Sequence, residues 1–208
     1  MSTNAMRLIL WIVTLLRVLL IPLFVYFAVT AQELGRSRLD SDPMRWATLA
    51  TMVVIGISDL LDGWIARRFD LISDRGSMAD SVADKLAQVA LVTFFTLNVG
   101  PAFTPLPFWF FLVVFGRDLT LVVGVLVLRV RYGPLEVGHR AHGRLTSILF
   151  IAVLLWAVLR LPAAGLIPLA LATALLSIIS GTIYALDGAA QGKAFAMRKR
   201  EEIRTLRG

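Results

Sequence analysis

The chain has 208 residues, of which 58% are hydrophobic, and its mean hydropathy is +0.78. Soluble domains contain about 45–50% apolar residues, so this composition excludes an ordinary soluble globular protein. The absence of cysteine excludes disulfides and thiolate chemistry, and two histidines, His139 and His142, nearly exclude a histidine triad or multi-histidine metal site. A net charge of +7 would suggest nucleic acid in a soluble chain, but basic residues flanking apolar spans instead indicate a multi-pass membrane protein.

Six apolar stretches are each long enough to cross a bilayer, since about 20 helical residues span about 30 Å of hydrocarbon. Because backbone groups must be hydrogen-bonded in lipid and barrel-like alternation is missing, all six are predicted to be helices. The fifth is short and is expected to extend into the basic segment before it. The prediction is an all-α polytopic membrane protein with six helices in a single bundle over residues 1–208 and a short basic tail at 190–208. The helices are expected near residues 8–31, 45–66, 77–98, 105–128, 145–161 and 164–187.

The first apolar stretch could also be interpreted as a removable signal peptide that ends near residue 31. However, its apolar run is longer than the roughly 7–15 residues of such a peptide, and it contains Arg17 and Pro22. We therefore expect a retained helix.

The distribution of basic residues predicts the orientation. If the amino terminus is cytoplasmic, fourteen basic residues fall on the inner side and four on the outer side. We therefore expect both termini, and the connection between the second and third helices, on the cytoplasmic side of a bacterial inner membrane. The inner set is Arg7, Arg67, Arg68, Arg75, Arg129, Arg131, Arg140, Arg144, Lys193, Arg198, Lys199, Arg200, Arg204 and Arg207, and the outer set is Arg36, Arg38, Arg45 and Arg160.

Four aspartates lie in the second and third stretches, where an ionisable side chain costs several kcal/mol unless it is paired or hydrated. Helical spacing places them, with small residues and one arginine, on one face of each helix. A short polar connection predicts antiparallel neighbours, so the four carboxylates should converge at the cytoplasmic edge. The two sets are Asp59, Asp62, Gly63, Ala66 and Arg67 on the second helix, and Gly76, Asp80 and Asp84 on the third.

Four close carboxylates repel one another strongly, and divalent cations would neutralise them. Ligands that are all carboxylates favour hard metals, so Mg²⁺ or Mn²⁺ is expected. Gly63, Ala66 and Gly76 leave room for a bulky ligand beside the acids, although close packing of two helices explains each small residue equally well.

The spacing D-x-x-D-G-x-x-A-R-x8-G-x-x-x-D-x-x-x-D resembles the signature of the CDP-alcohol phosphatidyltransferase family, and all eight fixed positions match over 26 residues. The six-helix layout also fits that family. The resemblance implies an enzyme that uses two divalent cations to cleave the anhydride of a CDP-linked lipid or alcohol. It transfers the phosphate-bearing part to a hydroxyl and releases CMP.

The resemblance also implies roles for individual residues. Asp59, Asp62 and Asp80 would be the main metal ligands, and Asp84 would complete the second metal site and act as the catalytic general base. Arg67 would contact the nucleotide diphosphate, with a cytoplasmic anchor as the alternative. The implied CDP-binding set is Asp59, Gly63, Ala66, Arg67, Gly76 and Asp80.

Two further basic residues, Arg117 and Arg144, are expected to bind the acceptor, because the family has a basic residue near each position. For Arg117, a purely structural pair with Asp118 is the alternative. The sequence around Arg117 and Glu136 resembles cardiolipin-synthase-type members. The expected substrates are therefore CDP-diacylglycerol and a glycerol-containing acceptor, either glycerol 3-phosphate or phosphatidylglycerol, with inositol phosphate and serine as lesser options. Arg17 is not assigned a role, because Trp11 stands where glycerophosphate-type members often have asparagine.

Two hypotheses compete with this interpretation. A small ion or proton transporter could use the buried aspartates, but it would be expected to show a repeat or a helix broken at the midplane. An inactive relative that serves as a scaffold is the other, and the intact acidic positions argue against it. Membrane lipids are expected partners and nucleic acid is not, and a homodimer stays open.

Overall fold

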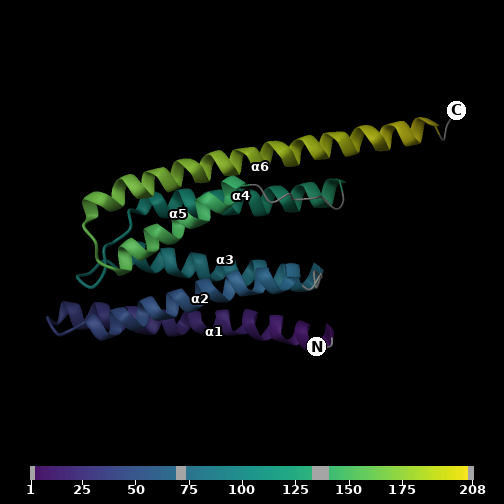
Figure 1. Cartoon of the computed structure of the whole chain (residues 1–208). Coiled ribbons are helices and arrows are strands. Elements are labelled where there is room, and N and C mark those ends of the chain that lie inside the picture. Colours follow the sequence, from purple (N-terminus) through teal and green to yellow (C-terminus); the bar gives the residue numbers. More distant parts are fainter. Residues whose placement is uncertain (1–2, 69–73, 133–140, 206–208) are drawn as a thin grey trace. The chain divides into compact units, whose positions relative to one another are not determined.

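The computed structural model describes residues 3–68, 74–132 and 141–205, with the side chains of residues 11–58, 61, 82–124, 126–127, 145–190, 192 and 197. Within those residues the chain is all-helical, with six helices and no strand (Figure 1). The helices are α1 (Thr3–Arg36), α2 (Asp42–Arg68), α3 (Asp74–Leu97), α4 (Phe108–Tyr132), α5 (Ala141–Val158) and α6 (Ala163–Thr205).

The six predicted helices are confirmed, and two of their boundaries are informative. Helix α5 begins at Ala141, so the expected extension into the preceding basic segment is present. Helix α6 continues from the predicted end near residue 187 to Thr205. The added stretch is rich in alanine, lysine, arginine and glutamate, which have high helix propensity. The basic segment therefore continues a helix, which hydropathy alone does not predict.

Two helical segments in the described part of the chain are long and apolar enough to cross a bilayer, Trp11–Arg36 and Ala163–Ala190, and a shorter apolar one is Leu145–Val158. Only 17% and 33% of the most apolar windows of the two long segments are buried, whereas the core helix of a soluble protein would be mostly buried. Exposed large apolar side chains occur on other helices as well, including Val54, Leu86 and Val122. Such apolar surface is rare on soluble monomers, and it indicates a membrane protein.

The chain forms two compact units. Unit 1 comprises Met1–Pro107 and Leu154–Ala163, and therefore contains α1, α2, α3 and the end of α5. Unit 2 comprises Phe108–Val153 and Ala164–Gly208, with α4, most of α5 and α6. A single bundle of six transmembrane helices stays a prediction.

In unit 1, helix α1 packs against both α2 and α3. The centroid of the Phe24 ring lies 5.7 Å from that of Phe94 and 5.9 Å from that of Phe95, both edge to face. Phe103 closes the cluster at 5.4 Å from Phe95. Edge-to-face pairs add to the burial of these rings. The cluster fixes α1 and α3 in register.

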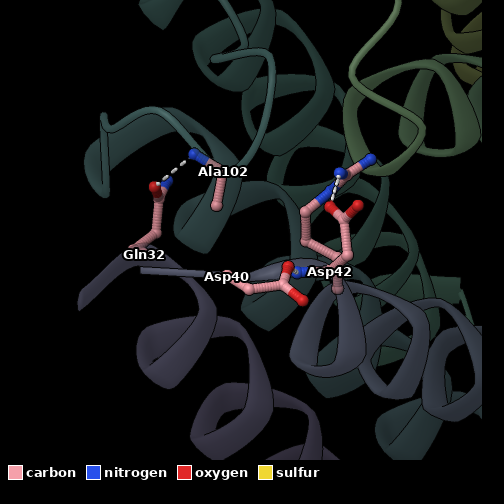
Figure 2. Close-up of polar contacts among 5 residues, drawn as sticks. Gln32, Asp40, Asp42 and Ala102 are labelled. Carbon is pink, nitrogen blue, oxygen red and sulfur yellow. Dashed lines mark hydrogen bonds and ion pairs between the residues drawn. The ribbon is translucent and has the colours of Figure 1, made fainter. Parts of the chain in front are cut away.

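At one end of unit 1, the side chain of Gln32 holds the turn that follows α3 (Figure 2). Its Nε2 donates to the carbonyl of Asn98 at 2.8 Å, and its Oε1 accepts from the backbone N–H of Ala102 at 3.1 Å. Gln32 is 1% exposed. Because buried backbone groups need partners, this amide takes the place of a regular helix cap.

Two arginines end helices in the left-handed conformation, Arg38 with φ 58° and Arg160 with φ 57°. After α5, the N–H of Leu161 bonds to the carbonyl of Trp156 and the N–H of Arg160 to that of Ala157. This is the Schellman pattern, whose left-handed position is usually glycine. Arginine there carries a conformational cost of about 1–2 kcal/mol.

In unit 2, the Phe110 and Phe150 rings stack between α4 and α5, with their centroids 6.4 Å apart. Helix α6 buries one face. Its buried positions recur every three or four residues, as expected for one side of a helix. They are Leu166, Ala170, Thr173, Ala174, Ser177 and Ser180.

Candidate functional site

All eight motif positions lie on helices. Positions 59, 62, 63, 66 and 67 are in the second half of α2, and positions 76, 80 and 84 are in the first half of α3. The helical spacing assumed for the motif is therefore confirmed at the backbone. Of these eight residues, only Asp84 has a described side chain. The side chains of Asp59, Asp62, Gly63, Ala66, Arg67, Gly76 and Asp80, and the connection at 69–73, lie outside the described residues.

The buried face of α2 leads into the acidic positions. Thr51, Met52, Ile55 and Ser58 are buried and recur at helical spacing. Position 59 follows Ile55 by four residues, and position 62 follows Ser58 by four. Both therefore continue the same helical face.

Helix α3 shows the same relation in reverse. Ala83, Ala87 and Leu91 are buried, and positions 80 and 84 precede Ala87 by seven and three residues. The side chain of Asp84 is half-buried and has an electrostatic or hydrogen-bonding partner. Next to it, Lys85 donates to Oε1 of Gln88 at 3.0 Å, so its ammonium lies along α3.

The contacts that α1 makes with α2 and α3 show which residues of these two helices lie at the same level along the helix axes. Arg17 contacts Ser58 on α2, and Phe24, seven residues later, contacts Phe94 on α3. Because α1 and α3 run in the same direction, seven residues back from Phe94 leads to Ala87. Arg17, Ser58 and Ala87 therefore lie at a similar height.

From that height the acidic positions follow in one direction along both helices. With a rise of about 1.5 Å per residue, position 62 is about 6 Å beyond Ser58, and position 84 is about 5 Å beyond Ala87. Position 59 lies about 2 Å beyond Ser58 and position 80 about 10 Å beyond Ala87 by the same rise. The four positions thus lie within about 9 Å of one another along the helix axes of unit 1, on the same side of the Arg17 level.

Arg17, to which the family resemblance gives no role, also lies in this region. It is fully buried, at 0% exposure, and its Nε lies 3.5 Å from Oγ of Ser58, at the outer limit of a hydrogen bond. The same hydroxyl donates to the carbonyl of Ile55 at 2.7 Å. A basic residue inside an apolar run was the available signal, because such residues face protein interiors. Arg17 links α1 to the residue directly before Asp59.

Arg117 and Asp118 lie in α4 of unit 2. Asp118 is buried, and Nη1 of Arg117 lies 3.8 Å from its Oδ1. The ion pair expected as the structural alternative is therefore present. Because the two groups are 3.8 Å apart, the guanidinium of Arg117 can also donate to another hydrogen-bonding oxygen. Arg144 lies in α5, and its side chain is outside the described residues.

The candidate metal ligands are oxygen donors from one acidic set, which suits Mg²⁺ or Mn²⁺. Among the described side chains, no group of three or more histidine, aspartate or glutamate residues gathers as a metal site. Asp59, Asp62 and Asp80 stand outside that set, so the metal centre stays a prediction. The helical register fits it, and so does the placement of all four positions on the same side of the Arg17 level.

Relatives of the chain are found among phospholipid-synthesising enzymes. Over 145 residues it is 30% identical to a cardiolipin synthase (CMP-forming) of Streptomyces coelicolor, covering 69% of this chain and 62% of the relative. Over 120 residues it is 28% identical to a CDP-diacylglycerol–glycerol-3-phosphate 3-phosphatidyltransferase of Bacillus subtilis, covering 56% and 59%. An Aquifex aeolicus protein of the latter name is 26% identical over 148 residues, covering 71% and 72%. The match thus spans about 60% of the length of the first two relatives.

No solved structure matches the chain at a significant level. The model of the CDP-alcohol phosphatidyltransferase family matches residues 10–179, which include every motif position and both acceptor candidates. The resemblance inferred from the motif is therefore confirmed. The chain belongs to the CDP-alcohol phosphatidyltransferase family.

Proposed function

We propose that the chain transfers the phosphatidyl group of CDP-diacylglycerol to a glycerol-type acceptor, either glycerol 3-phosphate or phosphatidylglycerol, and releases CMP. Family membership supports the reaction class, and the names of the relatives from Streptomyces coelicolor and Bacillus subtilis support both acceptors. The observation that carries the proposal is the complete acidic motif on α2 and α3, with its four aspartate positions on the same side of the Arg17 level.

The proposed metal ligands are Asp59, Asp62, Asp80 and Asp84, for two divalent cations. When bound, Mg²⁺ or Mn²⁺ would neutralise the diphosphate and stabilise the charge on the attacking and leaving oxygens. The four positions continue buried faces of two helices that both pack on α1. Carboxylates at such positions are costly without a cation or another partner.

Asp84 is the proposed general base. It accepts the proton of the acceptor hydroxyl while that oxygen forms a bond to the lipid-bearing phosphorus. The bond from this phosphorus to the bridging oxygen breaks, and CMP leaves with that oxygen. Asp84 is only half-buried, which suits a residue that must meet a substrate. Arg67 would hold the diphosphate, and Gly63, Ala66 and Gly76 would leave space for the nucleotide.

Arg117 and Arg144 are the proposed acceptor-binding residues. An arginine presents several N–H donors to phosphate oxygens, and both acceptors contain a phosphate group. The 3.8 Å separation of Arg117 and Asp118 supports this assignment, because it is longer than a charge-assisted hydrogen bond.

We also propose that all six helices cross the membrane as one bundle, with both termini and the active site on the cytoplasmic side of a bacterial inner membrane. Support comes from the exposed apolar side chains and from the excess of basic residues on one side. Helices α2 and α3 are less apolar because they carry the charged motif residues, which a catalytic site at the membrane edge would need.

The test is CMP release from CDP-diacylglycerol by purified protein in detergent with Mg²⁺ or Mn²⁺. The acceptor panel contains glycerol 3-phosphate, phosphatidylglycerol, inositol phosphate and serine, and the lipid product is identified by mass spectrometry. Asp84→Asn and Asp80→Asn should abolish release. Asp42→Asn is the matched control, because Asp42 lies at the opposite end of α2, is exposed and pairs with Arg45. No CMP with any acceptor, or full activity of both variants, would refute the proposal.

A further inference from the structure

The guanidinium of Arg117 is only partly satisfied. Its side chain is 17% exposed, and its Nη1 lies 3.8 Å from Asp118. Its Nε is buried and has no hydrogen-bond partner in the part of the chain that the structure describes. A guanidinium has five N–H donors and no acceptor, so the Nε–H of Arg117 can donate a hydrogen bond to a ligand oxygen. Leaving a buried charged donor unpaired is costly.

Helix α6 meets Arg117 at a glycine. A Cβ atom added to Gly181 would lie 3.2 Å from Cγ of Arg117 and 4.0 Å from its Cδ and Nε. The stem of Arg117 therefore lies against the backbone of α6. A methyl group at position 181 would require this stem to shift by a few tenths of an ångström. Gly181 is four residues after Ser177, and so shares the face that α6 buries.

Ser180, the neighbour of Gly181, carries a second unsatisfied group. It is fully buried, and its Oγ has no hydrogen-bond partner among the described residues. Other hydroxyls of α6 bond to the carbonyl four residues earlier, Thr173 to Leu169 at 2.8 Å and Thr182 to Ile178 at 2.9 Å. The hydroxyl of Ser180 makes no such bond, and its hydrogen is therefore available to a ligand.

Nε of Arg117 and Oγ of Ser180 could both donate to the same kind of ligand. Nε of Arg117 is a charged donor, and Oγ of Ser180 is a neutral donor on the residue next to Gly181, which contacts Arg117. A ligand that accepts from both has several oxygens and negative charge, as a phosphate group does. Asp118 lies near Nη1 of Arg117, so it does not occupy the position at Nε that the ligand would take.

We propose that Ser180 binds the phosphate of the acceptor together with Nε of Arg117, and that Gly181 provides the gap in which Arg117 lies. Ser180 and Gly181 would then select phosphorylated acceptors. The identity of the ligand as acceptor rests on the proposed transferase function. The site itself rests on the two buried donors and the glycine contact.

The experiment compares Ser180→Ala and Gly181→Ala with Thr182→Ala, whose hydroxyl is exposed and bonded to its own helix. Michaelis constants are measured for CDP-diacylglycerol, glycerol 3-phosphate and phosphatidylglycerol in nanodiscs. Loss of one hydrogen bond to a charged group predicts that Ser180→Ala raises the acceptor constant about tenfold. The constant for CDP-diacylglycerol should stay unchanged. The acceptor that shows the rise identifies whether the phosphate comes from a soluble molecule or a lipid.

A second readout needs no catalysis. Glycerol 3-phosphate and inorganic phosphate should raise the melting temperature of the wild-type protein, glycerol should not, and Ser180→Ala should reduce the shift. Without ligand, Ser180→Ala should melt no lower than wild type, because the hydroxyl it removes is unpaired. Unchanged acceptor constants and phosphate shifts in Ser180→Ala would overturn the site, even in an active enzyme. A phosphate shift that depends on Ser180 in a protein that releases no CMP would keep the site and reject the transferase.

Discussion

Gly100→Ala tests the clamp that Gln32 forms at the end of α3. A Cβ at position 100 would lie 2.9 Å from Cδ of Gln32, and closer still to its Oε1. The amide can avoid this contact only by giving up its bonds to Asn98 and Ala102. Each bond contributes about 1 kcal/mol, and a buried group left unpaired costs about 1–3 kcal/mol. We expect a loss of about 2–3 kcal/mol in unfolding free energy.

The assay is thermal unfolding in detergent, followed by circular dichroism. For a chain of this size, about 2–3 kcal/mol corresponds to a fall of about 5–10 °C in Tm. Gly56→Ala is the matched control, because nothing lies within 4 Å of the added Cβ in the interior of α2. Alanine should stabilise that position by up to about 1 kcal/mol.

A double-mutant cycle tests whether the loss of stability comes from the contact with Gln32. In a Gln32→Ala background the added methyl group meets no amide, so Gly100→Ala should cost little beyond the loss from Gln32→Ala itself. Equal melting of Gly100→Ala and wild type, or full additivity of the two substitutions, would refute the clamp.

Two other predictions concern buried charge and backbone conformation. Arg17→Met should lower the unfolding free energy by about 2 kcal/mol, because the buried guanidinium has a further partner besides the long contact with Ser58, and hydrogen bonds to a charged group contribute about 1.5–3 kcal/mol. Arg17→Lys should not rescue it, since the contact with Ser58 uses Nε; wild-type melting of both variants would contradict this. Arg160→Gly should stabilise the end of α5 by about 1 kcal/mol, because glycine adopts positive φ without the cost that arginine carries. Arg160→Ala keeps that cost, so equal Tm values for the alanine and glycine variants would exclude the explanation.

Helix positions were predictable from the sequence because apolar runs of bilayer length leave the backbone few alternatives. Asp59 and Asp84 were predicted on helices because both lie within such apolar stretches. The boundaries were less predictable. Helix α6 extends to Thr205 through a charged segment that hydropathy separates from the apolar part, although its residues favour helix.

Contacts between distant residues were not predictable from composition or spacing. Gln32 bonds to Ala102 across 70 positions, and no local signal marks that pair. Arg17 did carry a signal, its charge within an apolar run, but only the packing of α1 on α2 indicates where it points. Likewise, the sequence singled out Arg117 but not Ser180, because one serine on an apolar helix resembles many others.

The burial of Arg17 has a consequence for biogenesis. Helix α1 leaves the ribosome before α2 does, so the translocon must accept its charged side chain before Ser58 is available. Insertion of an arginine near a helix centre costs about 2.5–3.5 kcal/mol, and the surrounding leucines, isoleucines and valines offset this by about 0.3–0.6 kcal/mol each. The first segment can therefore insert alone, and the contact of its guanidinium with Ser58 forms when the second segment arrives. Pairing of these two segments is thus an early event in the maturation of the nascent chain.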